Sequence, residues 1–248
     1  MTPPSEGTPG SLVVVGSGIR PGLHTTQEAR VRIESADTVL YLLAEAAPTA
    51  WISALNHSAE SLDRIYQPGR RHDEVYRALV DTMLEHVRRG ENVCVVTYGN
   101  PAVFDQSSHE AVRRARAEGF AAAILPGISA LDCLFVDLGL DPGQDGLQCF
   151  DATDFLALRK EPDTGVPLVL WQISVIGDTV TSGAVSTDGL RTLAGRLAEL
   201  YGNEHEVTVY EATPYPVGRP MIERCPVSGL PMAGVTGLST LYVPPRRA

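Results

Sequence analysis

Short apolar runs and longer amphipathic stretches alternate along the first half of the chain. Runs of β-branched and aliphatic residues are typical of buried strands. The predicted strands are residues 11–15, 37–42, 93–96 and 121–125. Between them, apolar residues recur every three or four positions, as on one face of a helix. Thr25 or Thr26 can cap the first predicted helix, which carries Ala29 and Ile33 on one face. The other predicted helices are residues 73–90, 107–118 and 128–138. This alternation predicts an α/β fold with a mostly parallel sheet.

The pattern changes after Gly139, where a turn-rich segment, residues 141–146, precedes a half of the chain with many prolines. The elements predicted there are strands at residues 168–172, 206–210 and 239–243 and a helix at residues 187–201. We place a domain boundary within residues 126–139. The expected parts are a flexible N-terminal arm (1–10), an N-terminal α/β lobe (11–130) and a C-terminal α/β lobe (131–248). A cleft between two such lobes is a usual location for a ligand.

Composition narrows the classes of function. Thirty acidic residues against twenty basic ones give a net charge of −10, which disfavours nucleic-acid binding. The apolar runs are far shorter than the roughly 20 residues that cross a bilayer, and the first ten residues do not resemble a signal peptide. The four cysteines form neither a CxxC motif nor a cluster with histidine, so we expect buried, reduced thiols and no metal. These features favour a cytoplasmic protein without a membrane partner.

Three glycine-containing loops follow predicted strands. Their residues are 16–22, 97–104 and 125–132. Ligands of open α/β sheets bind at the carboxyl ends of the strands, so we interpret the loop at residues 97–104 as a ligand loop. The loop at residues 16–22 lacks GxGxxG spacing and fits a plain strand-to-helix turn equally well. In the third loop Ser129 can cap the following helix, whose N-terminal amides could hold a carboxylate, although capping alone requires no ligand.

Two further stretches carry candidate chemistry. Residues 66–76 combine Tyr66 and Tyr76 with Arg71 and His72, groups that can polarise a carbonyl or move a proton, although composition alone also fits a solvated loop. Gln172 ends a predicted strand, where its amide can either form hydrogen bonds with a ligand or face solvent. The sequence contains no Ser/His/Asp order or carboxylate pair that supports a hydrolase.

Together these loops resemble the tetrapyrrole-methylase superfamily, whose members are S-adenosylmethionine-dependent methyltransferases. The likeness is strongest to the borosin-type peptide backbone α-N-methyltransferases and covers residues 10–246. The stretches that carry it are residues 99–104, 108–111, 115–119, 125–130, 132–137, 151–156, 171–172 and 238–245. The resemblance implies two α/β lobes, with a mostly parallel N-terminal sheet, a mixed C-terminal sheet and the cofactor in the cleft between them.

The resemblance also implies site residues. S-adenosylmethionine, or its product S-adenosylhomocysteine, would contact Tyr98, Asn100, Val103, Phe104, Ser129, Ala130, Gln172, Ala212, Ser239 and Thr240. The catalytic loop would supply Tyr66, His72 and Tyr76. The chain departs from the family pattern at His72, where an arginine is usual and the neighbouring Arg71 could substitute. It also departs at Asp63, where a tyrosine is frequent, and at Asn100, where a histidine is frequent.

Fungal members of this branch carry the substrate peptide on their own C-terminus, whereas this sequence ends at Ala248, directly after its last predicted strand. We therefore expect a separate precursor peptide as the substrate in trans and, by resemblance, a homodimer. The alternatives are a methyltransferase for a tetrapyrrole or another small molecule, and a catalytically silent binding protein of the same fold.

Methylation of an amide nitrogen poses a specific chemical demand. The nitrogen lone pair is delocalised into the carbonyl, so the nitrogen must lose its proton while the oxygen gains negative charge. The site then needs a base and a donor for the oxygen. Tyr66, Arg71, His72 and Tyr76 could supply both, and we expect adjacent cations to favour an ionised tyrosine.

Overall fold

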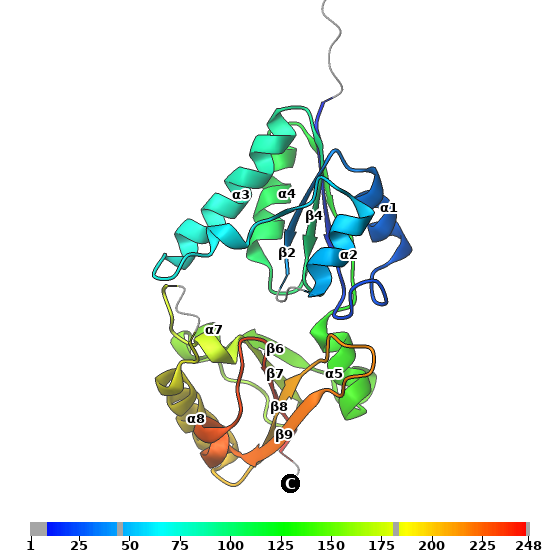
Figure 1. The fold of residues 1–248 in the computed structure, drawn as a ribbon. Helices are drawn as coiled ribbons and strands as arrows, with labels where there is room; N and C mark the ends of the chain where they lie inside the picture. The colour runs from blue at the N-terminus through cyan, green and yellow to red at the C-terminus, as the bar shows by residue number, and fades with distance from the viewer. Residues whose placement is uncertain (1–8, 44–46, 181–183, 247–248) are drawn as a thin grey trace, which may run out of the picture. The chain divides into compact units, whose positions relative to one another are not determined.

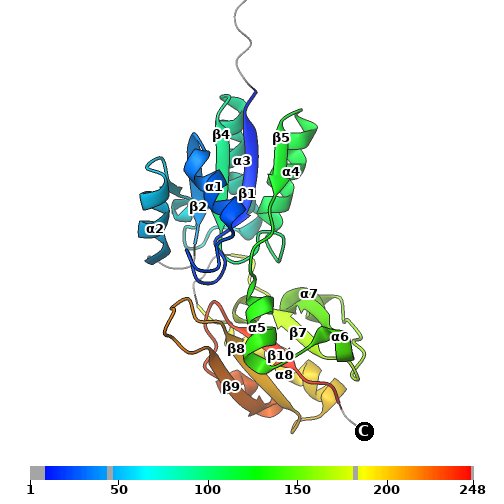
Figure 2. The same cartoon turned by 90° about the vertical axis from the view of Figure 1, so that its right-hand side faces the viewer.

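The computed structural model describes residues 9–43, 47–180 and 184–246, and the chain divides into two compact units. Unit 1 is Met1–Ser129 and unit 2 is Ala130–Ala248. Each unit has a five-stranded sheet and its own hydrophobic core. The chain colours of Figures 1 and 2 run from blue to green through unit 1 and from green to red through unit 2.

Unit 1 is a parallel sheet with helices on both faces. Its strand order is β3-β2-β4-β1-β5, and the neighbouring strands pair in parallel. The strands are β1 (Ser11–Gly16), β2 (Thr38–Leu42), β3 (Glu60–Ser61), β4 (Asn92–Thr97) and β5 (Ala121–Ile124). The helices are α1 (Gln27–Ser35), α2 (Ala47–Leu55), α3 (His72–Arg88) and α4 (Gln106–Ala117), with a 3-10 turn, η1 (Asp63–Ile65), before α3. Helices α1 and α2 lie on one side of the sheet and α3 and α4 on the other (Figure 1).

Alternation along β4 shows how side chains reach the two faces. Val93 and Val95 pack into the core that α3 and α4 cover, which we call the α3/α4 face. Cys94 and Val96 pack into the core under α1 and α2, the α1/α2 face. The apolar residues that recur with the helical period within residues 73–90 are all buried in α3; they are Val75, Leu79, Val80, Met83, Leu84 and Val87. Thr26 caps α1, since its side chain accepts a hydrogen bond from Ala29 N.

Unit 2 contains a mixed sheet of order β6-β7-β10-β8-β9. Strand β6 runs parallel to β7, and the remaining pairs are antiparallel. The strands are β6 (Gln148–Asp151), β7 (Leu168–Trp171), β8 (Glu206–Glu211), β9 (Met221–Pro226) and β10 (Thr240–Val243). The helices are α5 (Ala130–Leu138), α6 (Pro142–Asp145), α7 (Ala152–Ala157) and α8 (Thr187–Tyr201), with 3-10 turns η2 (Ile173–Val175) and η3 (Val227–Met232).

The unit 2 core lies between one face of its sheet and helices α7 and α8. Val207 and Val209 of β8 pack there with Leu193 and Leu197 of α8. Helix α5 lies against the opposite face of β8, where the Tyr210 hydroxyl donates a 2.7 Å hydrogen bond to Asp137. The predicted parallel first sheet and mixed second sheet are thus confirmed.

Several elements differ from the sequence prediction. Helices α2 and α7 and strands β3, β6 and β9 were not predicted, the turn-rich segment contains α6, and α5 begins at Ala130 instead of residue 128. Of the predicted arm, residues 1–8 lie outside the described residues. Gly10 is buried, and a Cβ there would lie 2.1 Å from Val87 O.

The structure shows the state of the four cysteines, and its described helices and side chains can be searched for a membrane span and a metal site. Cys94 is buried as expected, whereas Cys133, Cys149 and Cys225 are only half-buried, and all four are free thiols. Burial raises the pKa of the Cys94 thiol to about 12. Among the described residues, no helix combines the length and apolarity required to cross a bilayer, and no group of acidic, histidine and cysteine residues could hold a metal ion.

Candidate functional site

The loops after β1, β4 and β5 meet at the carboxyl edge of the unit 1 sheet. Two backbone hydrogen bonds, each 3.2 Å, join Gly18 and Gly99. A Cβ on Gly16 would lie 2.1 Å from Gly99 O, and one on Gly127 would lie 2.7 Å from the same oxygen. Any larger residue at these positions would therefore separate the loops. The structure brings the three glycine-containing loops together at backbone contact.

The loop after β4 carries four of the predicted cofactor residues. Tyr98 packs against the core of the α1/α2 face. The Asn100 side-chain oxygen accepts a 3.0 Å hydrogen bond from Ala102 N, and Val103 N donates to Asn100 O at 3.0 Å. Phe104 is 42% exposed and has a φ of 54°, in the left-handed region that a phenylalanine rarely adopts. Such backbone strain is concentrated at functional sites.

Asp105 fixes the start of α4 directly after this loop. Its carboxylate accepts hydrogen bonds from Ser108 N at 3.1 Å, Ser107 Oγ at 2.7 Å and Ser108 Oγ at 2.5 Å. Ser107 and Ser108 are both buried. The helix therefore begins in a rigid cap at the carboxyl edge of the sheet.

Three of the four predicted catalytic residues gather where α3 begins. Tyr66 directly follows η1, and His72 and Tyr76 lie one helical turn apart with ring centroids 6.2 Å from each other. Arg71 precedes the helix, and its Nε donates a 2.9 Å hydrogen bond to Asp73 Oδ1 while 62% of its side chain is exposed. The neighbouring arginine is therefore engaged with an exposed carboxylate, and His72 shares the helix face of Tyr76.

The electrostatics of Tyr66 contradict the expectation of an ionised phenol. Burial of the hydroxyl raises its pKa well above the usual value, and Tyr76, Asp105 and Asp63 raise it further. The residue as a whole remains 37% exposed. Tyr66 is therefore a neutral hydrogen-bond donor at physiological pH. Arg71, one of the cations on which the expectation relied, pairs with Asp73 instead.

Four predicted cofactor residues of unit 2 lie at one edge of its sheet. Gln172 is exposed directly after β7 with a φ of 57°, and buried Ala212 directly follows β8. Strand β10 runs antiparallel between these strands, so its first residue, Thr240, lies beside their carboxyl ends. Ser239 Oγ lies 3.5 Å from Glu211 Oε2. Ser239 and Thr240 are both 3% exposed.

The two remaining cofactor candidates flank the division of the chain. Ser129, the last residue of unit 1, is 5% exposed, and Ala130 begins α5. Asp105 was not singled out from the sequence. Asp105 is followed by Gln106 and then two serines at the start of a periodic stretch, a helix-start signal that could have been found. Thr97 falls within the predicted ligand loop at residues 97–104, but its residue type assigned it no individual role.

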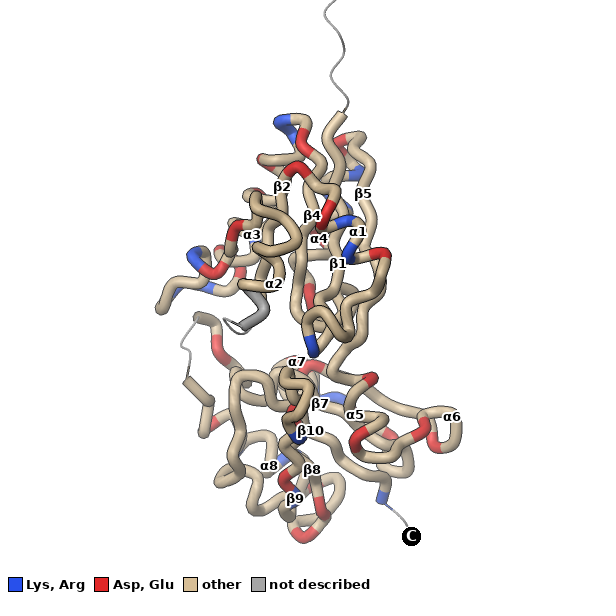
Figure 3. Tube along the Cα trace, turned by 45° about the vertical axis from the view of Figure 1, so that its right-hand side comes forward, with Lys and Arg blue, Asp and Glu red and all other residues tan. Residues whose placement is uncertain are grey.

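Charged side chains are dispersed over both units, as the blue and red segments of Figure 3 show. Several pair locally along or between helices, for example Arg88 with Glu118 at 2.6 Å and Arg114 with Asp81 at 2.9 Å. Within the described ranges, we see no continuous basic stripe of the kind that binds nucleic acid.

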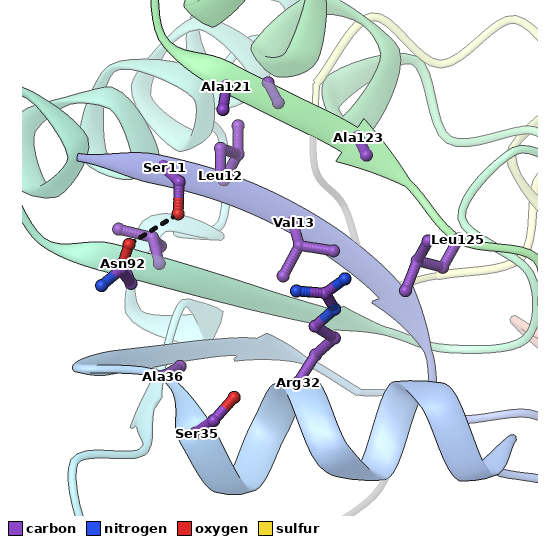
Figure 4. A pocket seen from close by; sticks show the side chains of 12 residues that line it. Ser11, Leu12, Val13, Arg32, Ser35, Ala36, Asn92, Ala121, Ala123 and Leu125 are labelled. Carbon is purple, nitrogen blue, oxygen red and sulfur yellow. Dashed lines mark hydrogen bonds between the residues drawn. The ribbon is translucent and has the colours of Figure 1, made fainter. Parts of the chain in front are cut away.

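A separate cavity of about 510 Å³ lies on the α1/α2 face of unit 1, near β5. Ala121 and Ala123 line it with small side chains, and Arg32 of α1 extends toward Val13 (Figure 4). Helix α1 borders the cavity with Arg32 and Ser35, and strands β1, β4 and β5 supply most of its remaining lining. Its lining includes none of the predicted site residues, all of which are described.

The chain matches known proteins over most of its length. Residues 11–225 match the family described as tetrapyrrole (corrin/porphyrin) methylases. The chain is 36% identical over 244 residues to a methyltransferase/type I borosin cyclic peptide precursor of Coprinopsis marcescibilis, covering 96% of this chain and 62% of that protein. It is 35% identical over 243 residues to the methyltransferase/omphalotin A precursor of Omphalotus olearius, covering 96% and 58%. The chain thus spans about three-fifths of these relatives.

Solved structures agree on the fold. Uroporphyrin-III-C-methyltransferase from Thermus thermophilus superposes with a TM-score of 0.68 at 20% identity, covering 95% of this chain and 92% of that one. The cobalamin biosynthetic enzyme cobalt precorrin-4 methyltransferase gives a TM-score of 0.65 at 18% identity, with 94% of each chain covered. Together with the family match, these findings confirm the resemblance stated from the sequence: the chain belongs to the tetrapyrrole methylase family.

Proposed function

We propose that this chain is an S-adenosylmethionine-dependent methyltransferase that N-methylates backbone amides of a peptide supplied as a separate molecule. The observation that carries the proposal is the group of Tyr66, His72 and Tyr76 beside the carboxyl edge of the unit 1 sheet. It is supported by the 34–36% identity to proteins named as methyltransferases fused to cyclic-peptide precursors. Those names describe the relatives, and an assay must establish the substrate of this chain.

The loops of unit 1 fit the proposed cofactor. The packing of Gly16, Gly99 and Gly127 holds these loops together at the carboxyl edge of the sheet, where ligands of open α/β sheets bind. We assign cofactor binding to Tyr98, Asn100, Val103, Phe104, Ser129, Ala130, Gln172, Ala212, Ser239 and Thr240. When bound, S-adenosylmethionine supplies a methyl group activated by a sulfonium. No metal is part of the proposal.

The remaining chemistry falls to the residues near the start of α3. As the amide nitrogen loses its proton, negative charge grows on the amide oxygen, and the neutral Tyr66 phenol donates a hydrogen bond there. We assign acceptance of the amide proton to a ring nitrogen of His72, whose imidazole neighbours the Tyr76 ring on one helix face. Orientation of the amide by these groups lowers the barrier further.

The direct test incubates the purified chain with S-adenosylmethionine and synthetic peptides, followed by tandem mass spectrometry. The proposal expects methyl groups on backbone nitrogens. Two other results would reject it: methylation of a tetrapyrrole or another small molecule in place of peptides, and cofactor binding without turnover on any acceptor. Those results correspond to the small-molecule methyltransferase and the silent binding protein.

A comparison of His72→Ala with Arg71→Ala tests which residue takes the place of the family arginine. Because Arg71 is bound to Asp73 and His72 contacts Tyr76, we expect the larger loss of kcat in His72→Ala. Arg71→Ala should stay within a few-fold of the wild type. A larger loss in Arg71→Ala would reassign the role to Arg71.

We also propose that the chain forms a homodimer. Large apolar side chains in unit 2 are strongly exposed, among them Val217 at 97%, Met232 at 89% and Val136 at 80%. Exposed apolar surface favours association. Light scattering at micromolar concentrations should give twice the mass of the chain, and a monomer would contradict the proposal. A cytoplasmic location stays a prediction, which fractionation of the source cells would test.

A further inference from the structure

Thr97 carries a buried hydroxyl without a partner. The residue is 5% exposed, and its Oγ1 makes no hydrogen bond to any part of the chain that the structure describes. Buried hydroxyls are nearly always hydrogen-bonded, because removing one from water without compensation costs free energy. An exception within a folded protein therefore calls for an explanation, and a group that arrives with the substrate is one.

Thr97 is the last residue of β4 and lies on the face of the sheet that α3 and α4 cover. Val93 and Val95 of β4 face α3 and α4. Because side chains along a strand alternate between the two faces of a sheet, the Thr97 side chain lies on the same face as theirs. In the parallel register its neighbours are Leu42 on β2 and Gly16 on β1. Leu42 packs against the same core as Tyr76.

Other elements converge on this end of the α3/α4 face. Helix α3 begins there with His72 and Tyr76, and α4 begins there with its Asp105 cap. Tyr66 interacts electrostatically with both Tyr76 and Asp105, which places the phenol close to the start of both helices. Thr97 therefore lies on the sheet face that is covered by α3, the helix whose first turns carry two residues that the proposed reaction requires.

We propose that Thr97 binds the acceptor peptide by donating a hydrogen bond from its hydroxyl to a backbone carbonyl oxygen. This inference rests on the proposed function. A peptide offers carbonyl acceptors at every residue, and Tyr66 can satisfy only the one whose charge grows during the reaction. A second donor fixes the register of the peptide. A β-branched side chain at the end of a rigid strand suits this task, because its χ1 is restricted and little entropy is lost on binding.

The test compares Thr97→Val, which keeps the shape and removes the hydroxyl, with Thr97→Ser, which keeps the hydroxyl. Thr82→Val is a matched control, because the Thr82 hydroxyl is satisfied within α3 by Ala78 O at 2.8 Å. We expect kcat/KM for the peptide to fall roughly tenfold in Thr97→Val. Thr97→Ser and Thr82→Val should stay within about threefold of the wild type. The affinity for S-adenosylmethionine should be unchanged in all three variants.

Thermal unfolding without ligands separates substrate binding from a structural role. A hydroxyl without a partner in the chain contributes no hydrogen bond to the fold, so Thr97→Val should melt no lower than the wild type. Wild-type kinetics in Thr97→Val would overturn the inference while leaving the proposed function intact. A melting temperature lowered by several degrees would overturn it in favour of a structural hydrogen bond. If the wild type methylates no peptide, the proposed function fails and the peptide role of Thr97 fails with it.

Discussion

At the scale of single residues, the protonation of Tyr66 decides what the residue can do. Burial and the neighbouring Tyr76, Asp105 and Asp63 all raise the pKa of the phenol, which keeps the proton in place. Tyr66→Phe retains the ring and removes only the donor. We expect kcat to fall by about 10²–10³, the usual cost of losing one donor to a developing oxyanion. Cofactor affinity measured by calorimetry should hardly change.

The pH dependence of kcat provides the check on this assignment. An acid with a raised pKa stays protonated up to and beyond its reference value of about 10, so no Tyr66 ionisation should appear between pH 6 and 10. Tyr215→Phe is a suitable control, because Tyr215 is 52% exposed in unit 2. The opposite result would be a kcat that rises with pH in the wild type and does not rise in Tyr66→Phe. That result would make Tyr66 the base.

Gly16 tests the packing of the three loops. Its Cβ position lies 2.1 Å from Gly99 O and 3.1 Å from Pro101 Cδ. Gly16→Ala must displace backbone, and we expect it to lower the free energy of unfolding by about 2–3 kcal/mol and to weaken cofactor binding. Gly195→Ala, in open space on α8, should instead stabilise the chain by up to about 1 kcal/mol through helix propensity. Equal stabilities of the two variants in urea denaturation would reject the argument.

The candidate site was predictable from the sequence to different depths at different residues. The glycine-containing loops stand out because each follows a predicted strand, whereas Tyr66 and Tyr76 received catalytic roles through the family resemblance, since composition alone also fits a solvated loop. The sequence could not decide whether Arg71 or His72 takes the place of the family arginine, because the two are neighbours in the chain. The decision depends on the Asp73 carboxylate, which accepts a hydrogen bond from Arg71. Thr97 lies in the predicted ligand loop at residues 97–104, but a separate role for it could not be predicted, because the absence of a hydrogen bond is a property of three-dimensional packing.

At the scale of elements, Glu91 joins three parts of unit 1 at the amino edge of the sheet. Its carboxylate accepts hydrogen bonds from Thr38 Oγ1 at 2.5 Å and from Arg89 Nε at 3.0 Å, and it contacts His86 Nδ1 at 2.8 Å. The Thr38 and His86 hydrogen bonds lower the pKa of Glu91 below its usual value. This contribution to stability is therefore present above about pH 4.5 and is lost as the pH falls through the folded pKa.

Glu91→Gln should accordingly lower the free energy of unfolding at pH 7 by about 1 kcal/mol. The difference from the wild type should shrink below about pH 4.5, where the wild-type carboxyl also becomes neutral. Glu85→Gln, whose side chain is 70% exposed, serves as the control and should change stability little at either pH. If the difference in the free energy of unfolding between Glu91→Gln and the wild type does not depend on pH, the charge of Glu91 does not contribute to stability.

Elements with a clear period were predictable, and those without one were missed. Helix α8 at Thr187–Tyr201 agrees with the predicted bounds, because its buried leucines recur with the helical period. Strand β6 is only four residues long and half-buried throughout, so its sequence carries no alternation. Strand β9 alternates clearly in burial, but Glu223 and Arg224 and the terminal Pro226 obscure the apolar pattern.

At the scale of the whole molecule, each of the two units has hydrophobic cores of its own. The unit 2 core centres on α8 and β8, and unit 1 has a core on each face of its sheet. The proposed cofactor residues are distributed over both units, from Tyr98 to Thr240. A ligand that uses residues of both units should stabilise both against unfolding.

Calorimetric unfolding with S-adenosylhomocysteine tests this distribution. At a ligand concentration of 100 times Kd, binding should add about 2.7 kcal/mol to the free energy of unfolding. For a chain of this size, each kcal/mol shifts the melting temperature by roughly 2–4 °C. Gly127→Ala in unit 1 and Gln172→Ala in unit 2 should each reduce this shift, since each alters one part of the proposed site. If Gln172→Ala retains the full shift, that residue is not a cofactor contact; if neither variant reduces it, the assignment of the cofactor site is wrong.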